Sequence, residues 1–158
     1  MKKGTLAIVS TMFGAMVGAI GIEFFNLKIV SKKDEKVNKF KDYYNLLNRW
    51  LIVKHEGKSL EQYFIDNGYK TIAIYGMGEL GNRLYEELKN TNITIKYAID
   101  KEAGSTYSEL EIINIEDELE KVDVVIVSAI FAYEKIEKEL QQLIDYPIIS
   151  LEDVIYEL

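Results

Sequence analysis

Several residue types are missing or rare in this chain of 158 residues. It has no cysteine, one histidine (His55) and one proline. Without cysteine there can be no disulfides, cysteine-ligated zinc, iron–sulfur clusters or thiol nucleophiles. A single histidine excludes histidine-rich metal sites and most Ser-His-Asp triads built within one chain. The single proline excludes collagen-like and proline-rich linker classes.

Positive charge is scarce in the C-terminal two thirds. Residues 1–58 carry 11 lysines and arginines against 5 acidic residues, whereas residues 59–158 carry 8 against 21. We expect no nucleic-acid partner, because binding phosphates requires a surplus of cations. The basic first third suits an anionic membrane surface. With 48% apolar and 28% charged residues, the chain has the composition of a folded domain.

Charges are also absent from residues 4–22, a run of 19 mostly apolar residues near the N-terminus. As a helix it would span about 28 Å, close to the hydrocarbon thickness of a bilayer. The run predicts a transmembrane anchor over residues 1–27. The alternatives are a buried soluble helix and a cleaved signal peptide, for which Ala19-Ile20-Gly21 roughly fits the cleavage pattern.

Two features near the run bear on assembly and orientation. Gly14 and Gly18 form a GxxxG pattern, which favours close packing of two such helices and hence a homo-oligomer. Six lysines lie in residues 28–41, against two before the run. By the positive-inside rule we expect a single-pass protein of a bacterial inner membrane, with its C-terminal domain in the cytoplasm.

Residues 28–68 are predicted to form a helical stalk. No glycine or proline occurs between residues 23 and 56. Apolar residues recur there at spacings of three and four, which is typical of an amphipathic helix; they are Val37, Phe40, Tyr44, Leu47 and Leu51. This face could pack on the C-terminal domain, on another copy or on the membrane. Ser59 and Gln62 match a capping box for a short helix over residues 60–67.

Residues 69–158 alternate between strand-like and helix-like segments. We expect strands at 70–75, 95–99, 111–114, 122–128 and 147–150. We expect helices at 79–89, 116–121, 132–144 and 151–158. This alternation predicts an α/β fold, namely a half-Rossmann domain with about five mostly parallel strands flanked by helices. Acidic residues on these helices, Glu139 among them, are interpreted as solvated faces.

One motif suggests chemistry. Gly76, Gly78 and Gly81 form a complete G-x-G-x-x-G between a predicted strand and a predicted helix. The first glycine permits a tight turn, the second lets a pyrophosphate approach the backbone, and the third lets helix and strand pack closely. Asp100 follows 24 positions after Gly76, where a carboxylate can accept hydrogen bonds from a ribose. That carboxylate disfavours a 2′-phosphate, so NAD or a UDP-sugar is preferred over NADP.

Other observations favour a purely structural glycine turn. Glu79 lies within the motif, and the surrounding domain is acidic, which disfavours an anionic ligand. Ser128, after the fourth predicted strand, offers a hydroxyl, but its loop holds no general acid or base. An NAD-dependent oxidoreductase would therefore need a substrate site from a partner chain.

The segments IAIYGMGELG, YAID, VDVVIVSAI and PIISLEDVI resemble a family of small Rossmann-like domains in bacterial surface polysaccharide pathways. Such domains form the N-terminal part of sugar acetyltransferases and the C-terminal part of sugar C-methyltransferases. The resemblance covers residues 69–158. It implies nucleotide-sugar binding by Gly76, Gly78, Gly81 and Asp100, with Ser128 as a further candidate. The catalytic domains of those enzymes have no counterpart in this sequence.

Together these features lead to one expected function and two alternatives. The expected protein is a membrane-anchored, noncatalytic nucleotide- or nucleotide-sugar-binding accessory subunit of envelope polysaccharide synthesis. It would act with a partner protein of that pathway or as a homo-oligomer. The alternatives are an oligomeric interaction module without a ligand and the NAD-dependent oxidoreductase subunit. No catalytic or metal-binding residues are assigned.

Overall fold

The computed structural model describes residues 36–101 and 110–158. The chain divides into two compact units, Met1–Tyr44 and Asn45–Leu158. In the first unit, residues 36–44 are helical. The predicted membrane anchor lies outside the described residues, and within the described ranges no helix is long and apolar enough to cross a bilayer.

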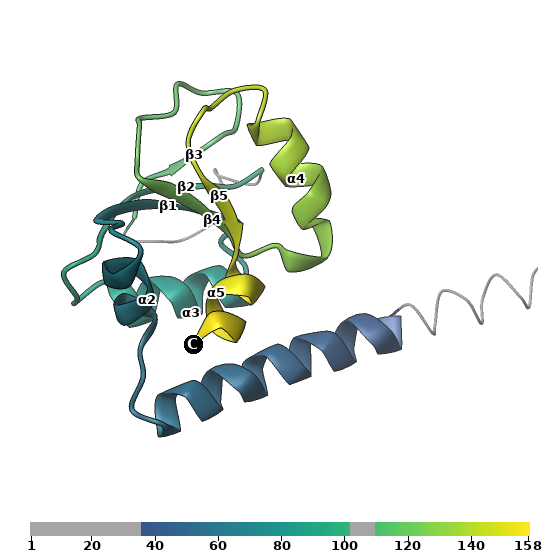
Figure 1. Ribbon diagram of the computed structural model, residues 1–158. Helices are drawn as coiled ribbons and strands as arrows, with labels where there is room; N and C mark the ends of the chain where they lie inside the picture. Colours follow the sequence, from purple (N-terminus) through teal and green to yellow (C-terminus); the bar gives the residue numbers. More distant parts are fainter. Residues whose placement is uncertain (1–35, 102–109) are drawn as a thin grey trace, which may run out of the picture. The chain divides into compact units, whose positions relative to one another are not determined.

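The second unit is an α/β fold built on a five-stranded sheet, and every strand pair in it is parallel (Figure 1). The strand order is β3-β2-β1-β4-β5. The strands are β1 (Thr71–Tyr75), β2 (Thr94–Ile99), β3 (Ile112–Ile113), β4 (Val124–Val127) and β5 (Ile148–Ser150). All residues of β4 are buried, as expected for a central strand covered on both faces. The predicted half-Rossmann class agrees with this architecture.

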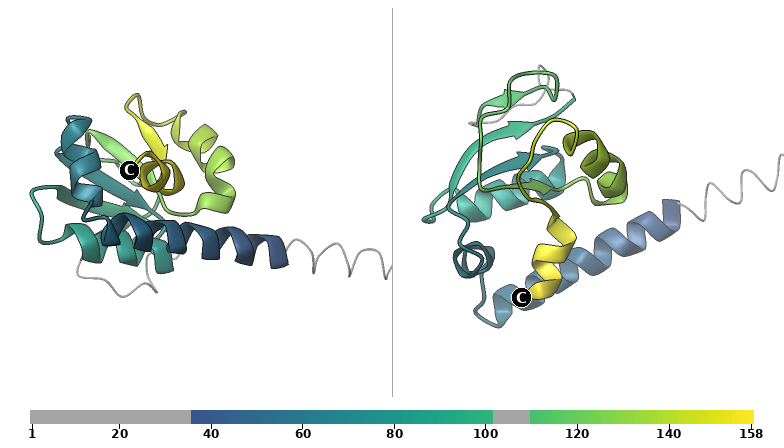
Figure 2. Two further views of the ribbon diagram at one scale, coloured as in Figure 1. Left: turned by 60° about the horizontal axis from the view of Figure 1, so that its bottom comes forward. Right: turned by 45° about the horizontal axis from the view of Figure 1, so that its top comes forward.

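The helices cover both faces of the sheet (Figures 1 and 2). They are α2 (Leu60–Asp66), α3 (Glu79–Leu88), α4 (Tyr133–Leu140) and α5 (Leu151–Glu157). α3 connects β1 to β2, and α4 connects β4 to β5 on the other side of β1. Because parallel crossovers are right-handed, connections that run in opposite directions along the sheet place α3 and α4 on opposite faces.

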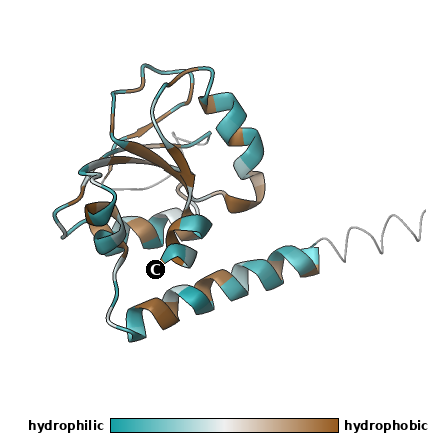
Figure 3. Cartoon of the chain, viewed as in Figure 1, coloured by the Kyte–Doolittle hydropathy of each residue, from teal (hydrophilic) through white to brown (hydrophobic). Residues whose placement is uncertain are grey.

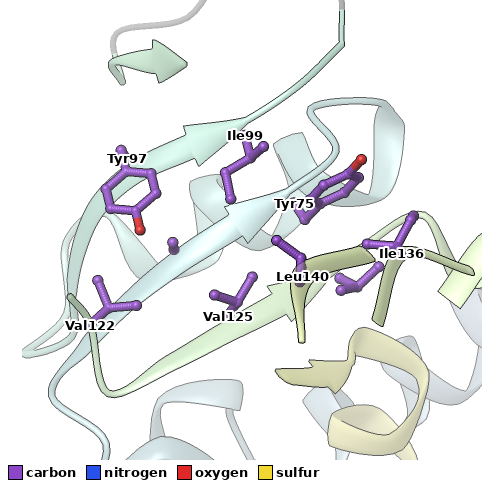
Figure 4. Close-up of a cluster of buried hydrophobic side chains, with 9 residues drawn as sticks. Tyr75, Tyr97, Ile99, Val122, Val125, Ile136 and Leu140 are labelled. Atoms are coloured by element: carbon purple, nitrogen blue, oxygen red, sulfur yellow. The ribbon is translucent and has the colours of Figure 1, made fainter. Parts of the chain in front are cut away.

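Alternating strand residues divide the core between these faces. On the α4 face, Tyr75, Ile99 and Val125 pack with Ile136 and Leu140 (Figure 4). On α3, the predicted apolar face of Leu80, Leu84 and Leu88 is buried. Figure 3 shows the strands as the most apolar part of the unit, with polar residues on the outer surfaces of the helices.

Two predicted helices differ from the structure. The helix expected over residues 116–121 does not form; the chain makes a turn there, in which Asp117 accepts a hydrogen bond from the N–H of Asn114 at 2.7 Å. The helix expected over residues 132–144 is a 3₁₀ turn, η1 (Ile130–Ala132), followed by α4. It ends before Leu143, whose spacing of three from Leu140 predicts an inward-facing side chain but which is exposed.

The predicted stalk also differs from the structure. A helix runs over residues 36–55, and its residues from Asn45 onward belong to the α/β unit. Leu46, Trp50 and Val53 are buried there, whereas Leu47 and Leu51 of the predicted apolar face are exposed. The buried face therefore lies beside the line of Leu47 and Leu51, at Trp50, which the sequence also predicts to be in the core.

Glu87 of α3 explains which face of the helix is buried. Its carboxylate accepts hydrogen bonds from Trp50 Nε1 at 2.8 Å and from the N–H of Leu60 at 3.2 Å. It also pairs with Lys54 at 2.6 Å. The predicted capping interaction at α2 is present, since Ser59 Oγ accepts from the N–H of Gln62 at 3.3 Å.

Candidate functional site

The candidate site lies at the carboxyl edge of the sheet, where β1, β2 and β4 end side by side. Gly76 follows β1, Asp100 follows β2 and Ser128 follows β4. From β1 the chain continues to β2 and β3 on one side, whereas β4 and β5 lie on the other. The strand order thus reverses between β1 and β4, which is where open parallel sheets bind ligands.

The three glycines of the motif differ in how strictly the fold requires a glycine at their positions. Gly76 has φ +92°, a conformation that side chains strongly disfavour. A Cβ on Gly81 would lie 2.0 Å from the carbonyl oxygen of Gly76, so α3 can approach the turn only without a side chain there. Gly78 has φ −70° and would find nothing within 4 Å of an added Cβ. The fold therefore requires Gly76 and Gly81 but not Gly78.

Asp100 and Ser128 both hold this turn in place. Asp100 Oδ2 accepts a hydrogen bond from the N–H of Met77 at 2.7 Å. Ser128 Oγ donates to the carbonyl of Gly76 at 2.6 Å and is buried. The structure thus brings together all five residues predicted from the sequence, and the side chains of Asp100 and Ser128 both bond the turn itself.

The start of α3 differs from those of α2 and α5. In α2 and α5 a serine side chain, Ser59 or Ser150, accepts a hydrogen bond from a first-turn N–H. The N-cap of α3 is Gly78, which has no side chain to do so. In a ten-residue helix these amide groups and the helix dipole favour an anion at this end. Glu79, in the first turn, places a carboxylate near the same end.

A cleft of about 350 Å³ opens beside the turn. Gly76 and the apolar side chains of Ala129 and Ile136 line it. Its polar lining residues are Tyr75, Asp100, Lys101, Lys135 and Glu139. Two acids and two lysines therefore share one cleft, so its formal charges balance.

Two polar atoms of this lining are buried without a hydrogen-bond partner among the described residues: Tyr75 Oη and Glu139 Oε2. Burial raises the pKa of Tyr75 above its ordinary value, and the negative charges of Glu139 and Asp100 raise it further. The sequence analysis missed both residues. Tyr75 directly precedes the glycine motif, which was a usable signal, whereas Glu139 resembles any solvated helix residue.

The described residues contain no group of three or more acidic or histidine side chains placed to hold a metal ion. The arrangement at the carboxyl edge offers hydrogen-bond donors, acceptors and a helix N-terminus within one cleft. Such a set of groups can bind a polar ligand in a fixed orientation. Comparison of the chain with protein-family models, curated proteins and solved structures gave no match.

Proposed function

We propose that the α/β unit binds a nucleotide or nucleotide-sugar at the carboxyl edge of its sheet without transforming it. Gly78 is the observation on which this proposal rests. A Cβ there would meet no strain and no neighbour within 4 Å, so neither the backbone conformation nor close packing requires a glycine, although glycine is also a favourable N-cap residue. A pyrophosphate at the start of α3 accounts for it, because the phosphate must approach the backbone closely at the second glycine of the motif.

The surroundings of Gly78 support the same ligand class. The uncapped start of α3 suits a phosphate, and the adjoining cleft has room for part of a nucleotide. The carboxylate of Asp100, at the end of β2, disfavours a 2′-phosphate by repulsion. A UDP- or NAD-type ligand is therefore favoured over NADP.

The biological role that we propose is that of an accessory or regulatory subunit in bacterial envelope polysaccharide synthesis. It rests on the resemblance of residues 69–158 to Rossmann-like domains of that pathway and on the apolar run at residues 4–22, which would anchor the chain in the inner membrane with this unit in the cytoplasm. The partner would be a synthesis protein of the pathway or a second copy of the chain.

Thermal unfolding of the purified full-length chain tests nucleotide binding. UDP, UDP-glucose, NAD and NADP would each be added at millimolar concentration to wild type and to Gly78→Val. A ligand at ten times its dissociation constant adds about 1.4 kcal/mol of stability. For a domain of this size the melting temperature should then rise by at least about 4 °C.

We expect Gly78→Val to fold with a loss of roughly 1 kcal/mol, because valine is a poorer N-cap than glycine, but to show no ligand-induced shift. Asn90→Val, an exposed change in the turn after α3, is the matched control and should keep the shift. If none of the four ligands stabilises wild type, or if Gly78→Val keeps the full shift, the proposed nucleotide site is wrong.

A second candidate function, an oligomeric interaction module, is favoured by one observation. The exposed Leu47 and Leu51 line a shallow hollow of about 370 Å³ with Trp50 and Arg83. Leu51→Asp should then reduce the oligomeric state measured by analytical ultracentrifugation. An unchanged sedimentation profile would exclude this surface as the contact.

A further inference from the structure

Tyr75 differs from the other tyrosines of the same core. Tyr75 is 4% exposed and Tyr97 is 3% exposed. The Tyr97 hydroxyl donates to the carbonyl of Glu120 at 2.7 Å, and the Tyr133 hydroxyl donates to the carbonyl of Ile148 at 3.0 Å. Tyr75 Oη has no partner in the described part of the chain. Phenylalanine would fill the same space without burying an unsatisfied hydroxyl, which is costly.

The Tyr75 hydroxyl lies at the tip of β1, beside Ile136 of α4 (Figure 4). The second unpartnered atom, Glu139 Oε2, comes from α4 and lines the same cleft. Tyr75 and Glu139 both line this cleft, and burial together with the negative charge of Glu139 raises the pKa of Tyr75. One offers an O–H donor and the other a carboxylate acceptor, and both are withheld from solvent.

The chemistry of this pair defines its ligand. A phosphate has no proton to donate and would leave Glu139 Oε2 unsatisfied, and an apolar group would leave both atoms unsatisfied. A hydroxyl group satisfies both, because it can accept from Tyr75 while donating to Glu139. Ala129 and Ile136 add apolar surface for the carbon skeleton of a ring.

We propose that Tyr75 and Glu139 form a subsite for hydroxyl groups of the sugar in the ligand bound at the glycine turn. The inference rests on the proposed nucleotide-binding function. Gly76 lines the same cleft, so phosphates at the start of α3 and a sugar in the cleft belong to one molecule. The sugar is either the ribose of the nucleotide or the hexose of a nucleotide-sugar, and both carry the required hydroxyls.

The first experiment measures stability without ligand. Tyr75→Phe in the full-length chain should raise the melting temperature by about 2 °C or more, because it removes a buried hydroxyl without a partner. Tyr97→Phe is the matched control and should lower it, because it removes a satisfied hydroxyl. A lower melting temperature for Tyr75→Phe would overturn the inference, since the hydroxyl would then be stabilising the fold itself.

The second experiment measures affinity by isothermal titration calorimetry with UDP, UDP-glucose and NAD. Tyr75→Phe and Glu139→Gln should bind at least about tenfold more weakly than wild type, as expected for a lost buried hydrogen bond. Tyr97→Phe should keep the wild-type affinity. A loss for UDP or NAD assigns the ribose to the subsite, and a loss for UDP-glucose alone assigns the hexose.

The outcomes separate this inference from the proposed function. If wild type binds these nucleotides and both variants bind them equally well, the subsite is wrong while the nucleotide site remains. If wild type binds none of them, both proposals are wrong. A weaker affinity of Tyr75→Phe, together with its higher melting temperature, supports the subsite, because a structural role would lower both.

Discussion

The polar groups at the two ends of β1 differ in their hydrogen bonding. At the amino end, the Asp123 carboxylate accepts hydrogen bonds from the N–H groups of Lys70 and Thr71, at 2.8 and 2.7 Å, and from Thr71 Oγ1 at 2.9 Å. At the carboxyl end, Tyr75 Oη and Glu139 Oε2 have no partner in the described ranges. The polar groups at one end of the strand are thus bonded within the protein, whereas two buried polar atoms at the other end have no partner among the described residues.

The largest effect should come from filling the contact between α3 and the glycine turn. Gly81→Ala places a Cβ 2.0 Å from the Gly76 carbonyl oxygen, so the helix must move away from the strand end. We expect a loss of about 3 kcal/mol in the free energy of unfolding. Urea denaturation of the full-length chain measures it. A loss below about 1 kcal/mol would show that the close approach is not required.

Stability should also be sensitive to substitutions at the amino end of β1. Asp123→Ala removes the acceptor for two backbone N–H groups and a hydroxyl, and we expect a loss of about 1.5 kcal/mol at pH 7. Thr71→Val, which removes the hydroxyl alone, is the control and should cost less. Equal losses in the two variants would mean that the backbone N–H groups contribute nothing.

The same carboxylate predicts a pH dependence. Hydrogen bonds from Lys70 and Thr71 lower the pKa of Asp123 in the folded protein. Its contribution is therefore fully present above the unfolded-state pKa of about 3.9 and is lost as pH falls through the lower folded-state value. The stability difference between wild type and Asp123→Ala should be constant from pH 7 to 5 and shrink below pH 4. A difference that grows in acid would contradict this.

Ser128→Ala should have a smaller effect, about 1 kcal/mol, because the Gly76 carbonyl loses its buried donor. Ser128 belongs to the structure of the turn, so nucleotide affinity should stay within about threefold of wild type when corrected for stability. Denaturation and calorimetric titration together measure both quantities. A large selective loss of affinity would instead make Ser128 a ligand contact, as the sequence suggested.

Gly78→Ala should have the smallest effect on stability, a loss of roughly 0.5 kcal/mol, because alanine is a poorer N-cap than glycine. The added methyl group meets open space at a φ that alanine accepts. Nucleotide affinity should nevertheless fall, because the methyl group lies where a phosphate approaches the backbone. Loss of stability without loss of affinity would place Gly78 with Gly76 and Gly81 as a structural glycine.

Local patterns predicted the strands and the glycine turn, because β-branched runs and turn glycines act over a few residues. They failed where residues distant in the sequence determine the local structure. The helix over residues 36–55 carries apolar side chains on two faces, and its buried face is selected by Glu87, 37 positions after Trp50. The segment 116–121 is rich in helix-forming residues, yet Asp117 bonds the backbone in a turn.

The candidate site, too, could be predicted from the sequence only in part. The glycine spacing and Asp100 predicted its position correctly, because both follow strand ends that meet at one edge of a parallel sheet. That Glu139 Oε2 has no hydrogen-bond partner among the described residues could not be predicted, because it depends on which groups of β1 and α4 face each other across the core. Sequence periodicity carries no information about the hydrogen bonds of a particular oxygen.

The burial of Trp50 gives the protein a built-in optical probe. It is the chain's single tryptophan, so the intrinsic indole emission reports one place, the contact between the helix residues after Asn45 and α3. Release of that helix would shift the emission to longer wavelengths as the indole enters water. Ligand binding in the cleft beside β1 should leave the emission spectrum unchanged unless the cleft and the contact between Trp50 and α3 are mechanically linked. Fluorescence thus detects detachment of the helix independently of ligand binding in the cleft.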